Sequence, residues 1–264
     1  MIKTPLINVM TAAALKAARG LKRDYGEVAN LQVSRKGPGD FVSAADKKAE
    51  KVLFEELSKA RPGYGFVMEE SGRVEGADRT HVWHVDPLDG TKNFLHSVPH
   101  YAISIGLERD GDVVAGCIFN PANDEMFVAE KGKGAYMNNQ RLRVAQRREL
   151  ADALVCCGIP HMGRGGFEVF RREIDLIMPK VSGIRRFGAA ALDLAYVAAG
   201  RCDAFWERGL SSWDLAAGIV IVREAGGFIT DINDSPDMMK TGSVLAGNPD
   251  MHQLILAIIK QAAK

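Results

Sequence analysis

Apolar positions in the first part of the chain recur with a helical period and then with the period of strands. Spacings of three and four predict helices over residues 1–25 and 44–59. A short apolar run at 81–86 predicts a strand that ends at Pro87, because proline cannot continue a central ladder. A strand meander follows, with strands expected at 101–108, 113–120, 125–130, 135–137 and 141–144 and a hairpin turn at 109–112. This part therefore reads as helices laid on a largely antiparallel sheet.

Strands and helices alternate beyond about residue 150. Strands are expected at 153–158, 183–187, 203–207, 227–231 and 243–247. Helices are expected at 165–178, 189–199, 214–225 and 251–260. Such alternation argues for a second layered stack of the α/β type. We expect two tightly packed units, residues 1–150 and 151–264, with a cleft between them.

The composition is that of an ordinary globular protein, with 264 residues, 47% hydrophobic and 25% charged. It excludes intrinsic disorder of the whole chain. The formal net charge of +1 argues against a protein coated with basic residues for nucleic acid or a membrane surface. Residues 131–186 nevertheless hold 12 basic and five acidic residues. This basic segment is either a solvated face or a surface for an anionic partner.

The four cysteines, Cys117, Cys156, Cys157 and Cys202, contain no CxxC pair. Free, buried thiols in a reducing cytosol fit this spacing better than a disulfide framework. The first ten residues carry no sustained apolar run of the signal-peptide type, and no apolar stretch reaches the roughly 20 residues that span a bilayer. The sequence therefore predicts a soluble, cytoplasmic protein without a membrane partner.

The stretch HVDPLDGTKNF at 84–94 contains the most informative chemistry. Asp86 and Asp89 lie three residues apart around a turn, where both can face one cation. The Leu88 carbonyl between them is free of a ladder and available as a further oxygen ligand. The amides of Gly90 and Thr91 then open a helical turn, where unpaired N–H groups favour an anion such as phosphate. The alternative is an Asx turn without a ligand.

Three other places could supply carboxylates to the same site. Glu69 and Glu70 end a short apolar run, although a solvated loop is the alternative. Asp214 begins an apolar helix, where an N-cap is the commonest use of aspartate and a metal ligand is the minority interpretation on local grounds. Asp40 and Asp46 bracket another helix start, at which Asp40 or Ser43 could serve only as a cap.

All of these candidate ligands are oxygen atoms, which favours Mg²⁺, Mn²⁺ or Ca²⁺ over zinc. No HExxH pair and no cysteine cluster is present. His84 shares strand parity with Asp86 but reads more readily as a neutral core histidine. The sequence contains no GxSxG, P-loop or GxGxxG motif, so a serine triad, a nucleoside triphosphate and a dinucleotide are not indicated.

Four segments together resemble the signatures of the inositol monophosphatase family, the lithium-sensitive, Mg²⁺-dependent sugar phosphatases. They are DPLDGT at 86–91, WDLAAG at 213–218, EES at 69–71 and the D-x-V-S-x-x-D element from Asp40 to Asp46. They occur in the family's order, and the resemblance, which is greatest to the bacterial inositol-1-monophosphatase branch, covers nearly the whole chain. It implies a five-layer αβαβα sandwich of the sugar-phosphatase type, in the α+β and α/β classes. We also expect a homodimer.

The resemblance implies a role for each site residue. The metal ligands would be Glu69, Asp86, the Leu88 carbonyl, Asp89 and Asp214. Two or three Mg²⁺ ions, or Mn²⁺, would clamp the phosphate and lower the pKa of a bound water. Thr91 and Asp46 would orient and deprotonate that water, and the Gly90 and Thr91 amides would hold the phosphate. Sugar hydroxyls would contact Asp89, Ala190 and Glu207.

The function expected from this resemblance is hydrolysis of inositol monophosphate or a similar polyol phosphate. Alternative substrates are fructose-1,6-bisphosphate, histidinol phosphate and a nucleotide bisphosphate. Asn93 favours a sugar phosphate, since related nucleotide phosphatases have Glu there, and Lys92 replaces a threonine common in the family. Arg35 and Lys36 compete for one basic position, so neither is assigned a role. A function of another class, in RNA polymerase antitermination and ribosomal RNA maturation, draws support from the basic segment.

Overall fold

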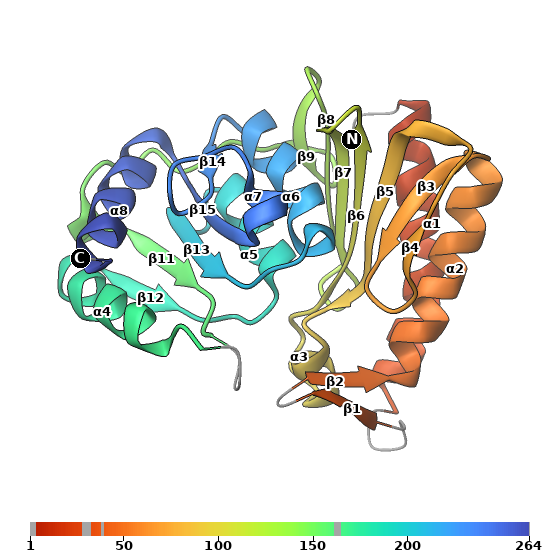
Figure 1. The fold of residues 1–264 in the computed structure, drawn as a ribbon, viewed down its shortest axis with the longest axis horizontal. Coiled ribbons are helices and arrows are strands. Elements are labelled where there is room, and N and C mark those ends of the chain that lie inside the picture. Colours follow the sequence, from red (N-terminus) through yellow and green to blue (C-terminus); the bar gives the residue numbers. More distant parts are fainter. Residues whose placement is uncertain (1–3, 28–32, 38–39, 161–164, 264) are drawn as a thin grey trace.

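Two β-sheets alternate with three layers of helices in the computed structural model of the chain (Figure 1). The structure describes residues 4–27, 33–37, 40–160 and 165–263, and the side chains of 28–43 lie outside this description. Separate apolar cores fill the space outside the larger sheet, between the sheets and outside the smaller sheet. The layers follow the order α, β, α, β, α, so the expected five-layer sandwich is confirmed.

The larger sheet has the strand order β10-β9-β8-β7-β6-β5-β3-β4. Its strands are β3 (Tyr64–Met68), β4 (Gly72–Val74), β5 (Asp78–Asp89), β6 (Ala102–Arg109), β7 (Asp112–Asn120), β8 (Glu125–Glu130), β9 (Gly134–Met137) and β10 (Gln140–Arg141). All neighbours are antiparallel except β3 and β5. The predicted hairpin between β6 and β7 is confirmed, and it turns at Asp110 and Gly111, whose φ values of 52° and 82° are both positive.

Two long helices cover the outer face of this sheet, α1 (Pro5–Tyr25) and α2 (Ala44–Ala60) (Figure 1). Thr4 caps α1 by accepting a hydrogen bond from the Ile7 amide at 3.2 Å, and Pro5 follows at the position where a missing N–H is harmless. Both helices confirm the predicted period, although residues 1–3 of the first prediction lie outside the described part. A separate antiparallel pair, β1 (Val33–Gly37) and β2 (Asp40–Ser43), precedes α2.

Strand β5 continues past Pro87, so the prediction that it ends there is wrong. Its pairing with β3 reaches only Met68 opposite Val85, and its pairing with β6 is irregular between Asp86 and Asp89. Pro87 therefore lies where no ladder bond is required of its nitrogen, which is how proline is tolerated at a strand irregularity.

The smaller sheet has the order β12-β11-β13-β15-β14 and is mixed. Its strands are β11 (Leu154–Cys157), β12 (Gly183–Arg185), β13 (Ala204–Arg208), β14 (Phe228–Thr230) and β15 (Ser243–Gly247). β11 pairs in parallel with β12 and β13, whereas β15 is antiparallel to β13 and β14. All five strands were expected within a few residues of these bounds.

Helices α5 (Ala190–Ala198) and α6 (Ser212–Glu224) form the middle layer, and α4 (Phe167–Ile177) and α8 (Pro249–Ala262) cover the outside of the smaller sheet (Figure 1). Two glycines let α6 approach the larger sheet. A Cβ on Gly106 would lie 2.5 Å from the Ala216 Cβ, and one on Gly116 would lie 2.5 Å from the Ala217 carbonyl oxygen. This close packing fixes the position of α6 and of the acid near its start.

The remaining short elements are helices α3 (Thr91–Leu95) and α7 (Met238–Thr241) and the 3-10 turns Leu150–Asp152 and Met178–Lys180. The strand expected at 141–144 is wrong beyond Arg141. There the chain leaves the sheet and crosses toward α6, with the Val144 amide donating to the Ala225 carbonyl at 3.1 Å. Within the described residues, no helix is both long and apolar enough to cross a bilayer.

The expectation of four free cysteines is wrong for one pair. Cys156 and Cys202 form a disulfide across 46 residues, because the parallel pairing of β11 with β13 brings Cys156 beside the segment that precedes β13. Cys117 and Cys157 are free and buried. Burial raises the pKa of each free thiol to about 12, which makes both poor nucleophiles.

Candidate active site

The end of β5 brings Asp86, Leu88 and Asp89 into one tight turn. The Asp86 carboxylate accepts a hydrogen bond from the Leu88 amide at 2.8 Å, which holds the turn closed. Asp86 and Asp89 are both buried. The turn therefore brings two carboxylates and a backbone carbonyl close together, and both carboxylates are shielded from solvent.

Gly90 follows in the left-handed region, with φ 86° and ψ 32°, and begins the single turn of α3. A Cβ there would lie 3.0 Å from the His100 carbonyl oxygen and 3.1 Å from the Ala189 Cβ, so both the dihedrals and the space require glycine. The Thr91 hydroxyl donates to the Leu88 carbonyl at 2.9 Å. This contact places the hydroxyl beside the expected carbonyl ligand.

Asp214 reaches the same place from α6. Ligand oxygens of Asp86, Asp89 and Asp214 all lie within 4.8 Å of one another. Asp214 is the third residue of α6 and completes a capping box by accepting a hydrogen bond from the Ser211 amide at 2.7 Å, so the N-cap is Ser211 and the N-cap interpretation of Asp214 is wrong. Asp214 therefore stabilises the helix start from the third helical position and also lies among the ligand candidates.

Two contacts from the larger sheet anchor the start of α6. The His84 ring bonds the Ser212 hydroxyl at 2.9 Å and the Glu108 carboxylate at 3.0 Å. The Ser104 hydroxyl donates to the Trp213 carbonyl at 3.1 Å. His84 is thus buried and fully engaged away from the carboxylate cluster, in agreement with the structural role predicted for it.

Asp89 also joins the two parts of the chain. Its oxygens accept hydrogen bonds from the amides of Ala190 at 3.2 Å and Ala191 at 2.8 Å, in the first turn of α5. Asn93 makes a second junction, because its side-chain amide donates to the carbonyls of His100 and Phe187, both at 2.8 Å. A glutamate at residue 93 could not make these two donations, so this asparagine has a structural role, and the sugar-phosphate preference expected from it stays a prediction.

The carboxylates of the cluster resist ionisation in the absence of a cation. Burial raises the pKa of Asp86 well above its usual range, and the charges of Glu69, Asp89 and Asp214 raise it further. Burial likewise raises the pKa of Asp89 to about 7, against the lowering effect of its backbone hydrogen bonds. A divalent cation would remove this repulsion. Closely spaced, buried oxygen donors therefore fit a hard metal ion.

Glu69 follows β3, and its amide donates to the Val85 carbonyl at 3.3 Å, beside the start of the Asp86 turn. Glu50, which the sequence interpretation missed, supports this corner from α2. Its buried carboxylate accepts from the Glu70 amide at 2.8 Å and from the Ser71 hydroxyl. Its position one helical turn beyond Asp46 is the only local signal that could have indicated it.

Glu207 lies at the end of β13 and leans over Gly158, where an added Cβ would lie 1.8 Å from its carboxyl carbon. Burial raises the pKa of Glu207 to about 8, and the charges of Asp214 and Asp89 contribute. Asp193 on α5 is a further buried acid that the sequence interpretation missed. Burial raises its pKa well above the ordinary value, and the charges of Glu207 and Asp89 add to this effect.

Asp46 is buried in the first turn of α2, while Ala190 is buried at the start of α5. The side chains of Asp40, Ser43, Arg35 and Lys36 lie outside the described part of the structure. The tightest grouping therefore comprises the acids of the Asp86 turn and Asp214, with Glu69 and Glu207 close enough to influence their pKa values.

A layered α+β fold that holds buried carboxylates beside a glycine turn could bind a metal ion together with a phosphate group. The model of the inositol monophosphatase family matches residues 2–264, and the chain belongs to this family. A Mesorhizobium japonicum protein named Inositol-1-monophosphatase is 59% identical over 261 residues, which cover 99% of this chain and 98% of that protein.

Other relatives carry different names. The Escherichia coli K12 protein named Nus factor SuhB is 39% identical, across 96% of this chain and 95% of its own. The solved inositol monophosphatase of Anabaena superposes with a TM-score of 0.84 at 34% identity, covering 97% of this chain and 95% of the other. The chain is therefore a phosphoric monoester hydrolase by family.

Proposed function

We propose that the chain hydrolyses inositol monophosphate, or a similar polyol phosphate, to the free polyol and inorganic phosphate. The observation that carries this proposal is the grouping of Asp86, Asp89 and Asp214 within 4.8 Å at the Gly90 turn. The name of the Mesorhizobium japonicum relative supports the choice of substrate.

The proposed cofactor is Mg²⁺, as two or three ions, with Mn²⁺ as a substitute. The residues that would hold it are Glu69, Asp86, the Leu88 carbonyl, Asp89 and Asp214. When bound, the ions supply a water of lowered pKa and neutralise charge on the phosphate and on the departing oxygen. The donor set is wholly oxygen, as these ions prefer.

The chain's own groups then position the reactants. Thr91, whose hydroxyl is fixed on the Leu88 carbonyl, and Asp46 would orient the attacking water and receive its proton. The Gly90 and Thr91 amides would bind the phosphate oxygens. The water oxygen bonds to phosphorus as the bond from phosphorus to the polyol oxygen breaks, and the polyol oxygen takes up a proton. Asp89, Ala190 and Glu207 would hold the polyol hydroxyls.

A panel of phosphate-release assays tests this proposal. Inositol monophosphate, fructose-1,6-bisphosphate, histidinol phosphate and adenosine bisphosphate are compared at equal concentration, with Mg²⁺ and with excess EDTA. The proposal expects Mg²⁺-dependent release that is fastest with inositol monophosphate. Faster release from one of the other three would replace the substrate, and equal release in EDTA would refute the metal mechanism.

A second candidate function is association with RNA polymerase in antitermination and ribosomal RNA maturation. The relative named Nus factor SuhB and the basic segment 131–186 favour it. Capture of RNA polymerase by the tagged chain, with an unrelated phosphatase as the control, tests it. We also propose that the chain forms a homodimer. Sedimentation of the chain alone should give twice the mass of one chain, and the mass of a single chain would contradict the proposal.

A further inference from the structure

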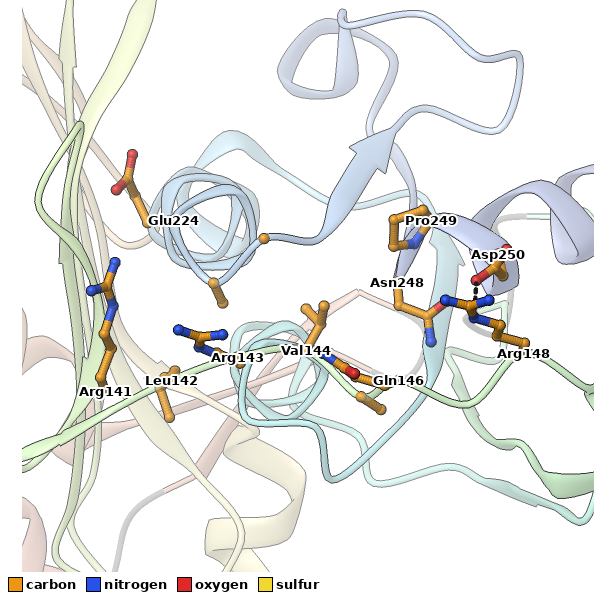
Figure 2. A pocket seen from close by; sticks show the side chains of 13 residues that line it. Arg141, Leu142, Arg143, Val144, Gln146, Arg148, Glu224, Asn248, Pro249 and Asp250 are labelled. Atoms are coloured by element: carbon orange, nitrogen blue, oxygen red, sulfur yellow. Dashed lines mark ion pairs between the residues drawn. The ribbon is translucent and has the colours of Figure 1, made fainter.

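A pocket remote from the carboxylate cluster lies where the extended segment after β10 passes the end of α6 and the start of α8 (Figure 2). Its volume is about 450 Å³, within the range of sites that enclose small molecules. Glu224, at the end of α6, lines it, whereas Asp214 lies near the start of the same helix. The ten-residue step from Asp214 to Glu224 places the two sites about 15 Å apart along the helix axis.

Three arginines of the basic segment line this pocket, Arg141, Arg143 and Arg148 (Figure 2). The two acids in the lining are already engaged. Glu224 accepts hydrogen bonds from two backbone amides, at 2.8 and 2.7 Å, and Asp250 lies 3.6 Å from Arg148. With three arginines against two acids, the lining carries a formal charge of +1.

Arg143 is an arginine of this lining whose charge is not paired with any described residue. Its side chain is exposed, and within the described ranges it makes no hydrogen bond and no ion pair. Arg147, one of its neighbours in sequence, behaves differently, because its guanidinium lies 3.0 Å from the fully buried Asp203 carboxylate. The basic segment thus contains both an arginine that is engaged in the structure, Arg147, and an arginine that lines the pocket without a described partner, Arg143.

The walls of the pocket are held in place by both parts of the chain. The Val144 amide donates to the Ala225 carbonyl at 3.1 Å, and the Asn248 side-chain amide donates to the Arg147 carbonyl at 2.9 Å. Asn248 also caps α8 by accepting from the Met251 amide. A fixed concave wall with uncommitted guanidinium groups is suited to a compact anion, since little ordering is needed on binding.

We propose that this pocket binds a small phosphorylated anion, at a site separate from the carboxylate cluster. Guanidinium groups pair with phosphate oxygens through short, charge-assisted hydrogen bonds, often two at a time. The limited volume of the pocket, about 450 Å³, favours a small phosphate compound over the extended backbone of a nucleic acid.

Inorganic phosphate and the ¹⁵N-labelled, Mg²⁺-loaded protein provide the test, read as NMR shifts of backbone amides. The proposal expects shifts at Ala145 and Gly226 whose titration curve is distinct from that at Gly90 and Thr91. Arg143→Ala should weaken only the pocket curve, by about fivefold or more, the effect of losing a charge-assisted contact. A pocket that shows no shift over the range that saturates the Gly90 turn would overturn the proposal.

The matched control is Arg185→Ala, an exposed arginine of the same basic segment that does not line the pocket. It should leave both titrations unchanged, and equal weakening by both variants would reduce the effect to general charge and overturn the proposal. A single-stranded RNA oligomer that shifts the pocket amides in an Arg143-dependent way, where phosphate does not, would also overturn it. If phosphate shifts the pocket amides but not those of Gly90 and Thr91, the result contradicts the proposed function and leaves the pocket proposal standing.

Discussion

Replacement of Asp89 by asparagine should affect the stability of the fold and the rate of catalysis in opposite directions. Both oxygens of Asp89 accept backbone hydrogen bonds, from Ala190 and Ala191. Asparagine keeps one acceptor and turns an amide toward the other donor, which forfeits about 1 kcal/mol of stability. Yet burial raises the pKa of Asp89 to about 7, so removing its charge relieves a desolvation cost on the order of a few kcal/mol above that pH. The metal-free variant should therefore unfold at the same temperature as the parent, or higher, at pH 8.

Turnover should respond in the opposite direction. Loss of one anionic ligand is expected to remove a few kcal/mol of transition-state stabilisation, about two decades or more in rate. Phosphate release at saturating Mg²⁺ and thermal unfolding with and without Mg²⁺ measure the two effects on one sample. Asp124→Asn, at an exposed turn, is the matched control and should change neither. Near-parental turnover in a well-folded Asp89→Asn protein would refute the reasoning.

Asp89 and Glu207 bind protons more tightly in the folded chain than in the unfolded chain, so without metal the free energy of unfolding should fall as the pH rises from about 4 to 8. Urea unfolding over this pH range measures the fall, and added Mg²⁺ should make it smaller. Glu50→Ala should raise the Mg²⁺ concentration for half-maximal activity by about tenfold, because it removes a side chain that supports the loop after Glu69. Glu50→Gln should restore part of the affinity, and the control Glu55→Ala, on the exposed face of α2, should have no effect. Gly106→Ala should lower the free energy of unfolding by about 1–3 kcal/mol through overpacking against α6, and unchanged chemical unfolding would contradict that packing.

Elements set by local pattern were predictable from the sequence. The turn at Asp110 and Gly111 needs two residues that accept a positive φ, and the aspartate–glycine pair supplies them whatever lies around it. The long helices have caps and periods within their own segments, as Thr4 and Pro5 show for α1. The signature at 86–91 was also informative because its ligand candidates, turn and glycine are adjacent in the chain.

Features that depend on distant segments were not predictable in this way. The disulfide between Cys156 and Cys202 follows from parallel pairing of β11 and β13, for which the cysteine spacing gives no sign. Strand β5 passes Pro87 because its neighbour β3 has already ended, a fact of sheet register. Glu50 meets the loop after Glu69 only because α2 packs there.

Anomalous diffraction from crystals soaked in Mn²⁺ and inorganic phosphate tests the central claim most directly. Mn²⁺ prefers the same oxygen ligands as Mg²⁺ and is visible by its own scattering. Metal peaks are expected between Asp86, Asp89 and Asp214, with phosphate oxygens against the Gly90 and Thr91 amides. Mn²⁺ bound only elsewhere on the chain, with this cluster empty, would contradict the claim.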